Sequence, residues 1–321
     1  MIRMTRMIRV STAAAVAVAV WCCSATLSAQ TAAPDRLATP TKVDVNVSLG
    51  GYSYVEPGDL RISIDGLKVG GEFTGAVSLN KTHRWFAQAN VRGLVGNTSY
   101  TGWCMPWLIR PNSASPNGYE LGLGPASACS GTGDKDWYME TRGLVGKDVI
   151  GRAWAVSPYS GVGFRHLSNG TTGNPGYRTD NYLYLPFGAT LRTEVASHHV
   201  LSLNLEYDVL ARGWQTTRNS LLGSGTVPAT PTAPAFVING FADVSFDQHG
   251  GWALRTSGKY ELTRRWSVEP YYIRWNVDDS TVSDAVIAFT VNNVTAHQQF
   301  HAYEPTNFTN EFGVKLGLRF R

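Results

Sequence analysis

The residues best suited to covalent chemistry are a histidine and a serine two positions apart. His166 and Ser168 share the parity of Val162 and Phe164 in an alternating run, and Asp180 follows further along the chain. A serine hydroxyl that passes its proton to histidine can attack an ester, and a carboxylate can orient the histidine. Shared parity puts His166 and Ser168 on one face of a strand, whereas Asp180 has the opposite parity. The pattern therefore permits an acyl-transfer site, and it fits the start of a polar loop equally well.

Two histidines and two cysteines offer other chemistry. His297 and His301 have the spacing of one helical turn, but their surroundings lack helix signals and a third ligand, so no metal site is predicted. Cys104 and Cys129 lie in one long polar stretch, and an exported compartment favours their oxidation. Their bridge closes a loop of about 26 residues, which is worth about 3.5 kcal/mol in the chain-entropy model. Two free thiols or a metal-binding pair are the alternatives. The sequence carries no phosphate-binding loop, and no cofactor is predicted.

The first residues have the features of an export signal. Three arginines precede an apolar run at 13–20, and small residues follow at 24–29, so residues 1–29 are predicted to be a cleaved signal peptide. An uncleaved anchor, or a lipoprotein attached at Cys22 or Cys23, is the alternative. Cleavage removes three of the 28 basic residues and none of the 24 acidic ones. The remaining chain is almost neutral, and nothing in its charge indicates nucleic-acid binding.

Apolar and polar residues alternate along the rest of the chain. The chain has 33 glycines, 10 tryptophans and 14 tyrosines, and only 16% of its residues are charged. Ten alternating runs of about 11–15 residues can each cross a membrane as a tilted strand. Short connections at 80–84, 147–151, 197–199 and 263–265 alternate with long ones at 56–66, 98–135, 167–179, 214–250 and 278–307.

This pattern predicts an all-β fold, an antiparallel up-and-down transmembrane β-barrel of about ten strands with short periplasmic turns and long extracellular loops. Residues 43–321 would form the barrel and 30–42 a linker. Eight or twelve strands remain alternatives. Residues 235–247 also alternate, but an eleventh strand would break the order of short and long connections, so they are assigned to an outer loop. In the run from Trp266 to Val277 the apolar parity changes, and a β-bulge near Pro270 is predicted.

Tryptophans recur near the ends of the predicted strands, where interfacial aromatic girdles lie. The predicted girdle comprises Trp85, Trp137, Trp154, Trp214, Trp252, Trp266 and Trp275. Core tryptophans of a soluble fold are the alternative.

Positions between the apolar ones should face the lumen, and their charges balance. Ten acids and ten bases fall there: Asp44, Glu72, Asp136, Glu140, Glu194, Glu206, Asp208, Glu261, Glu269 and Glu311 against Lys68, Arg92, Arg142, Arg165, Arg192, Arg212, Arg255, Lys259, Lys315 and Arg319. Balanced charges in a narrow barrel predict a salt-bridged, filled interior. A small or gated pore remains an alternative to a closed barrel.

Three segments resemble the small outer-membrane β-barrel proteins of Gram-negative bacteria, the porin-family or OmpA-like barrels. They are the runs at 157–167, 181–188 and 311–320. The resemblance implies an outer-membrane location among lipid and lipopolysaccharide. It also implies that the barrel-assembly machinery reads Phe320, which Arg321 follows. It leaves function open, because such barrels include pores, adhesins, structural proteins and a few enzymes.

A narrower resemblance concerns the histidine and serine. His166-Leu-Ser168-Asn169 is similar to the His-x-Ser-Asn element of outer-membrane lipid A 3-O-deacylases, which use a glutamate where Asp180 would serve. The main prediction is a non-catalytic barrel with a structural or surface-interaction role, or a narrow porin-like pore. Only the length of the loops favours an extracellular ligand. The alternative is a lipid A deacylase that uses His166 and Ser168.

Overall fold

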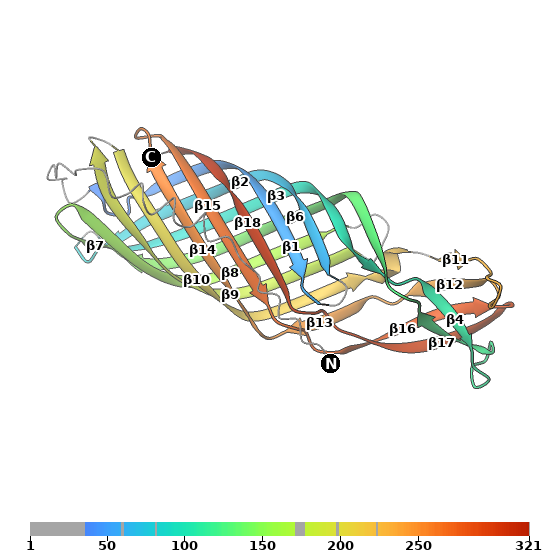
Figure 1. Ribbon diagram of the computed structural model, residues 1–321. Helices are drawn as coiled ribbons and strands as arrows, with labels where there is room; N and C mark the ends of the chain where they lie inside the picture. The colour runs from blue at the N-terminus through green and yellow to red at the C-terminus, as the bar shows by residue number, and fades with distance from the viewer. Residues whose placement is uncertain are drawn as a thin grey trace, which may run out of the picture.

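A closed ring of ten antiparallel strands forms the body of the protein (Figure 1). The computed structural model describes residues 36–58, 61–80, 82–170, 177–196, 199–222 and 224–320, so the predicted signal peptide lies outside the described residues. The wall strands, in order around the ring, are β1 (Lys42–Glu56), β2 (Ile62–Asn80), β3 (Trp85–Cys104), β6 (Ser127–Lys147), β8 (Trp154–Asn169), β9 (Tyr177–Ala196), β10 (His199–Arg218), β14 (Gly251–Glu261), β15 (Trp266–Val277) and β18 (Asn307–Phe320). The ring closes where β1 pairs with β18. The prediction of a ten-stranded up-and-down barrel is confirmed.

The outer surface of the wall carries a belt of apolar side chains. In β1, Val45, Val47 and Leu49 are 42%, 62% and 59% exposed, while the polar residues between them are buried inside. The other wall strands repeat this alternation. Exposing so many apolar side chains to water is unfavourable, whereas the hydrocarbon of a membrane accommodates them. The wall is therefore a membrane-spanning one. Among the described residues, no helix is long and apolar enough to cross a membrane.

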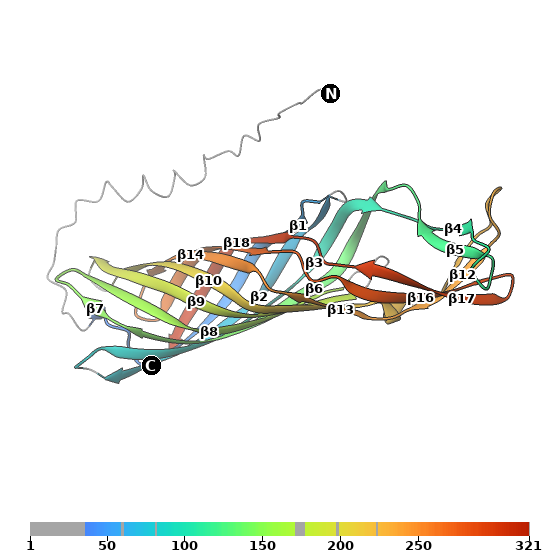
Figure 2. The same ribbon diagram turned by 90° about the horizontal axis from the view of Figure 1, so that it is seen from below.

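Short turns gather at one end of the barrel and long connections at the other (Figure 2). These are called the short-turn end and the long-loop end below. At the short-turn end, the Asn80 side chain accepts hydrogen bonds from the backbone amides of Thr82 and His83, which allows Arg84 to adopt a positive φ of 58°. The predicted turn at 147–151 contains a small extra strand, β7 (Val149–Ile150), which pairs with β8.

The wall strands are longer than the alternation predicted, and several predicted loops are correspondingly shorter. β3 and β6 stay paired as far as Cys104 and Ser127, well inside the predicted loop at 98–135. Only residues 57–61 connect β1 to β2, so the prediction of a loop at 56–66 was also too long. Beyond the apolar belt the polarity of the wall inverts: Ile62 and Ile64 face inward and Asp65 faces outward. The reason is that this part of the outer surface meets water.

The same inversion shows that the predicted bulge near Pro270 was wrong. β15 pairs with β18 in unbroken register from Trp266 opposite Leu318 to Val277 opposite Asn307. The apolar parity changes because the last residues of β15 project beyond the belt, where apolar side chains face inward. Trp275 is therefore only 2% exposed inside the barrel, and its assignment to the girdle was wrong.

A bulge occurs instead in β10. The register between β10 and β9 shifts between Leu210 and Arg212, so Leu210 is buried and Arg212 faces outward with 64% of its side chain exposed. The prediction that Arg212 lies in the lumen was wrong, because a single inserted residue reverses the alternation that follows it.

The long-loop end carries a compact β-structure, which we call the headpiece (Figures 1 and 2). It consists of a hairpin, β4 (Trp107–Pro111) and β5 (Tyr119–Leu123), and a four-stranded sheet, β11 (Gly225–Val227), β12 (Phe236–Phe241), β16 (Ser283–Val291) and β17 (Val294–Ala302). A short 3-10 helix, η2 (Asn219–Leu222), follows β10, and β13 (Val244–Gln248) extends the wall beside β10. The segment 235–247, which was assigned to an outer loop, is instead divided between the headpiece and the wall at the long-loop end.

Candidate functional site

Ten buried side chains, one from each wall strand, fill the middle of the barrel. We call them the central layer: Tyr52, Lys68, Arg92, Tyr138, Arg165, Tyr184, Asp208, Arg255, Trp275 and Glu311. Each of these residues is at most 7% exposed. Because every strand contributes a side chain, the layer reaches across the whole lumen.

Arg255 is the hub of one half of this layer. Its guanidinium donates to Glu140, with Nη1 at 3.1 Å from Oε2, and Nε lies 2.6 Å from Asp208 and 3.2 Å from Glu206. The Tyr184 hydroxyl also donates to Glu140. Three carboxylates therefore depend on one buried cation, with Arg142 as a second partner of Glu206 at 2.6 Å. Buried charges are stable only when they are paired and hydrogen-bonded in this way.

Glu311 is the corresponding hub of the other half. It accepts from Arg92, from the Tyr138 hydroxyl at 2.7 Å and from the Tyr271 hydroxyl at 2.8 Å. Arg165 lies over the ring of Tyr138, with its guanidinium carbon 4.3 Å from the ring centre.

Stacking contacts join the two halves of the layer. The Arg165 guanidinium carbon is 5.6 Å from the ring centre of Trp275, and the Trp275 ring packs edge-to-face on Tyr184. At the other side, Lys68 Nζ lies 3.2 Å from the ring centre of Tyr52 and 2.6 Å from an oxygen of Asp136. The central layer is thus one connected network of ion pairs, hydrogen bonds and cation–π contacts.

A second closure lies at the long-loop end. Glu304, in the connection between β17 and β18, is buried and shares two donors with Glu56. The Tyr54 hydroxyl is 2.9 Å from both carboxylates, and Arg178 Nη1 is 2.9 Å from Glu56 and 3.1 Å from Glu304. Burial raises the pKa of Glu304, and the neighbouring Glu56 carboxylate raises it further against the opposing effect of Arg178.

The short-turn side of the central layer is different, because it holds a polar cavity of about 180 Å³. We call this cavity the chamber. Its lining includes Glu72, Asn90, Arg142, Asn204 and Lys315. Lys315 bridges Glu72 at 2.7 Å, so here too opposite charges are paired across strands.

The ten acids and ten bases that were predicted to face the lumen do so with one exception. Apart from Arg212, they lie on the inner side of the wall, with Arg192 close to Asp148 and Lys259 close to Asp44 at the short-turn end. Sequence reasoning missed Glu56, Arg178 and Glu304, because it assigned their segments to loops. Sequence reasoning also missed the inward tyrosines. It treated aromatic residues as apolar, and apolar residues were expected to face the lipid and not the lumen.

The structure separates the three residues of the acyl-transfer hypothesis. Ser168 is opposite Thr179 and His166 opposite Asn181, which puts both on the outward parity of β8, but Ser168 is only 3% exposed; Asp180 is opposite Leu167 and buried inside. Among the described residues, no hydrogen bond joins Ser168 to His166. The His166 Nδ1 instead lies 2.7 Å from the Asn181 Oδ1, and the imidazole packs on Trp137. Asp180 cannot orient His166 through the sheet, so its proposed catalytic role was wrong.

The remaining aromatic and terminal predictions fall on the outer surface. Trp85, Trp154 and Trp266 are exposed at the first positions of their strands, whereas Trp137 is exposed in the middle of β6. Trp214 and Trp252 are half-buried and pack on Phe164 and Tyr207, respectively. Phe320 faces outward at the short-turn end, opposite Val43.

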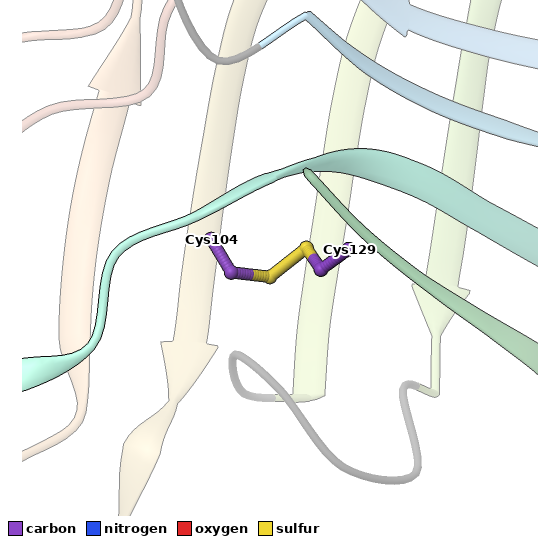
Figure 3. The surroundings of a disulfide bond; sticks show 2 residues. All are labelled: Cys104 and Cys129. Carbon is purple, nitrogen blue, oxygen red and sulfur yellow. A yellow bond between two sulfur atoms is a disulfide. The ribbon is translucent and has the colours of Figure 1, made fainter. Parts of the chain in front are cut away.

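The predicted disulfide joins Cys104 and Cys129 where β3 and β6 leave the wall for the headpiece (Figure 3). Their Cα atoms are 5.8 Å apart. The bridge closes the base of the segment that carries β4 and β5.

His297 and His301 lie on the headpiece in β17, where His301 Nδ1 contacts Asp284 at 2.8 Å. In the described part of the chain, no group of three or more His, Cys, Asp or Glu side chains could hold a metal ion.

Comparison with known proteins gives a likeness of fold alone. No protein-family model matches the chain, and no curated protein matches it. Among solved structures, the outer membrane protease OmpT from Escherichia coli has 11% identity and a TM-score of 0.42, over 88% of this chain and 98% of that one. The translocator domain of the autotransporter NalP from Neisseria meningitidis has 12% identity and a TM-score of 0.33, over 89% and 91%. A TodX mutant, described as a monoaromatic hydrocarbon channel, has 10% identity and a TM-score of 0.32, over 88% and 91%.

Proposed function

We propose that this protein is a non-conducting, non-catalytic outer-membrane barrel that holds its headpiece outside the cell as a contact surface for partners. In this proposal the short turns face the periplasm and the long-loop end faces outward, as in other outer-membrane barrels. One observation carries the proposal: the barrel is filled from wall to wall by the central layer, while the long-loop end carries a separately packed β-structure.

The central layer argues against a pore. Water and ions need a continuous polar path, and here each strand sends a buried side chain into one connected network. The chamber lies on the short-turn side of the layer. The closure formed by Glu56, Arg178 and Glu304 adds a second obstruction at the long-loop end.

The headpiece has the properties of a preformed interaction surface. A buried core of its own, which includes Ile109, Leu121, Phe236 and Phe289, stabilises it without help from the membrane. Gln298 of β17 ties the hairpin to the sheet, because its amide accepts from the Leu121 backbone N–H at 2.6 Å and donates to the Leu121 carbonyl at 2.7 Å. A rigid surface loses little entropy when it binds, which favours a recognition role.

Membership of the porin-family or OmpA-like small barrels belongs to the same proposal. It is supported by the filled lumen and by the outward-facing Phe320 in a closing strand that the assembly machinery could read. Outer-membrane lipid and lipopolysaccharide would surround the apolar belt and the exposed tryptophans.

The deacylase alternative lacks structural support. His166 and Ser168 share the outward parity of β8, but Ser168 is only 3% exposed and residues two apart on a strand are about 6.6 Å apart. The carboxylate is on the opposite face of the sheet.

The experiment compares cells that display the native chain with cells that display a variant in which a short Gly-Ser turn replaces residues 106–125. Adhesion is measured on plates coated with collagen, fibronectin or purified polysaccharide. Gel mobility before and after heating shows whether the variant barrel is folded. We expect the native cells to bind at least one coating more strongly than the variant cells. Equal adhesion on every coating by folded native and variant proteins would contradict the surface-contact role.

A further inference from the structure

The residues just before β1 cross the mouth of the barrel at its short-turn end. Arg36 pairs with Glu194 of β9 at 3.3 Å, and six residues later the chain enters β1 at Lys42. β9 and β1 are five strands apart in either direction around the ten-stranded ring, so they are diametrically opposed. A ten-stranded barrel is about 20 Å across, given a strand spacing of about 4.8 Å and a tilt of about 40°. Residues 36–38 form a turn, so the backbone from Arg36 to Lys42 spans less than the roughly 20 Å of six extended residues, and the side chains of the Arg36–Glu194 pair complete the crossing.

The middle of this segment is anchored against the inside of the wall. Thr39 donates from its backbone N–H to Asp148 Oδ2 at 2.6 Å and from its hydroxyl to Oδ1 at 2.9 Å. Leu37 and Thr39 are buried, whereas Arg36 and Pro40 are exposed. The inner wall beside this anchor includes Ala155 of β8, which has no exposed surface.

The anchor can be released without leaving a buried charge unpaired. Asp148 also accepts from the Ser157 hydroxyl and lies 3.4 Å from Arg192 Nη1, and both partners belong to the wall. When Thr39 leaves, Asp148 keeps these two partners. Within the described residues, the segment is also held by the burial of Leu37, by the exposed Arg36–Glu194 pair and by a hydrogen bond from the Ser78 N–H to the Thr41 hydroxyl at 3.2 Å.

We propose that residues 36–41 form a releasable gate, which covers the β6–β9 side of the short-turn mouth and controls the access of water and small ions to the chamber. The central layer is a fixed block, whereas this segment has a bound and a released arrangement. The gate and the central layer act independently of each other. Release of the gate therefore exposes the chamber, while the central layer still prevents the barrel from conducting.

The test uses a thiol reporter on the inner wall beside the Thr39–Asp148 anchor, in the chain without the predicted signal peptide and therefore without Cys22 and Cys23. Ala155→Cys places the reporter, and the two remaining native cysteines, Cys104 and Cys129, are joined as a disulfide. A membrane-impermeant maleimide is added to the refolded protein, and Thr82→Cys, in an exposed turn, measures the reactivity of an uncovered thiol. We expect Ala155→Cys to react at least ten-fold faster when Leu37→Asp is present, because a carboxylate at the Leu37 position must leave the buried site. The matched change at the half-buried neighbour, Ala38→Asp, should leave the rate unchanged.

A milder variant covers the case in which Leu37→Asp does not fold. Arg36→Gln with Thr39→Val removes the ion pair and the hydroxyl hydrogen bond while preserving size, and it should raise the labelling rate several-fold. Equal labelling of Ala155→Cys in all folded backgrounds, or labelling as fast as Thr82→Cys without any gate variant, would overturn the proposal.

Discussion

Replacing Arg255 with methionine removes the hub of the central layer while nearly preserving its length. The variant leaves Glu140, Glu206 and Asp208 buried, with only Arg142 as a remaining cationic partner of Glu206. Breaking a buried ion pair by removing one partner costs about 3–5 kcal/mol, since the other charge stays desolvated. We therefore expect the free energy of unfolding to fall by about that amount.

Arg212→Met is the matched control, because both arginines belong to wall strands and only Arg255 is buried. The Arg212 side chain is 64% exposed, pairs with Asp247 at 3.5 Å and lies 5.8 Å from the ring centre of Trp214, so its loss should cost about 0–1 kcal/mol. Urea unfolding of the refolded proteins in liposomes, followed by tryptophan fluorescence, gives both values. With a slope of about 3 kcal/mol/M, Arg255→Met should lower the midpoint by roughly 1–1.7 M. An equal, small shift for both variants would refute the claim that Arg255 holds buried carboxylates.

Four further outcomes are expected. Expression of the native chain or of Ser168→Ala should leave the lipid A mass spectrum unchanged; loss of an acyl chain with the native protein alone would establish the deacylase. Cys129→Ser should make the segment that carries β4 and β5 sensitive to protease while the barrel stays folded, because the bridge limits the freedom of this segment by up to about 3.5 kcal/mol; unchanged cleavage would show that the bridge is not needed. Gln298→Ala should likewise expose β5 to hydrogen exchange, with β16 still protected, and protection of both would contradict its role as a tie. Because burial raises the pKa of Glu304 above its ordinary value of 4.5, its proton stabilises the closed long-loop end at low pH and this contribution is lost as the pH rises through the raised pKa. Hydrogen-exchange protection of residues 303–306 should therefore fall with rising pH, and Glu304→Gln should flatten this dependence.

The membrane-spanning part of the fold could be predicted because its physics is local. Within the belt, each strand must present apolar residues to lipid and polar ones to the lumen, so parity alone identifies the face. The same rule places Glu140, Arg255 and Glu311 inside without any knowledge of their partners. The strand count followed from the alternation of short and long connections.

The errors lie where the solvent changes. Beyond the belt the outer surface meets water, and apolar side chains face inward instead of outward. Ile273, Trp275 and Val277 therefore have the inward parity, whereas the rule for lipid-facing strands expects apolar residues at the outward parity. The sequence pattern was therefore interpreted as a bulge that does not exist. The bulge at Arg212 was missed because the alternation up to Val209 was continued to Arg212 without an inserted residue.

The headpiece and the closure at the long-loop end could not be predicted, since they depend on partners far apart in the chain. Leu121 contacts Gln298, and Glu304 meets Glu56 and Arg178, only after the barrel has brought its long-loop end together. A local signal existed for the β16–β17 hairpin alone, where an Asn-Asn pair with positive φ connects two alternating runs.

Single-channel recording in planar bilayers tests the central claim most directly, namely that the central layer closes the barrel. The refolded native protein should give no conductance steps beyond those of a protein-free bilayer. A variant that removes three members of the layer, Tyr138→Ala with Arg165→Ala and Trp275→Ala, should give steps if it folds, which shows that inserted barrels can be detected. Reproducible steps from the native protein, at the level of the opened variant, would contradict the account of a filled, non-conducting barrel.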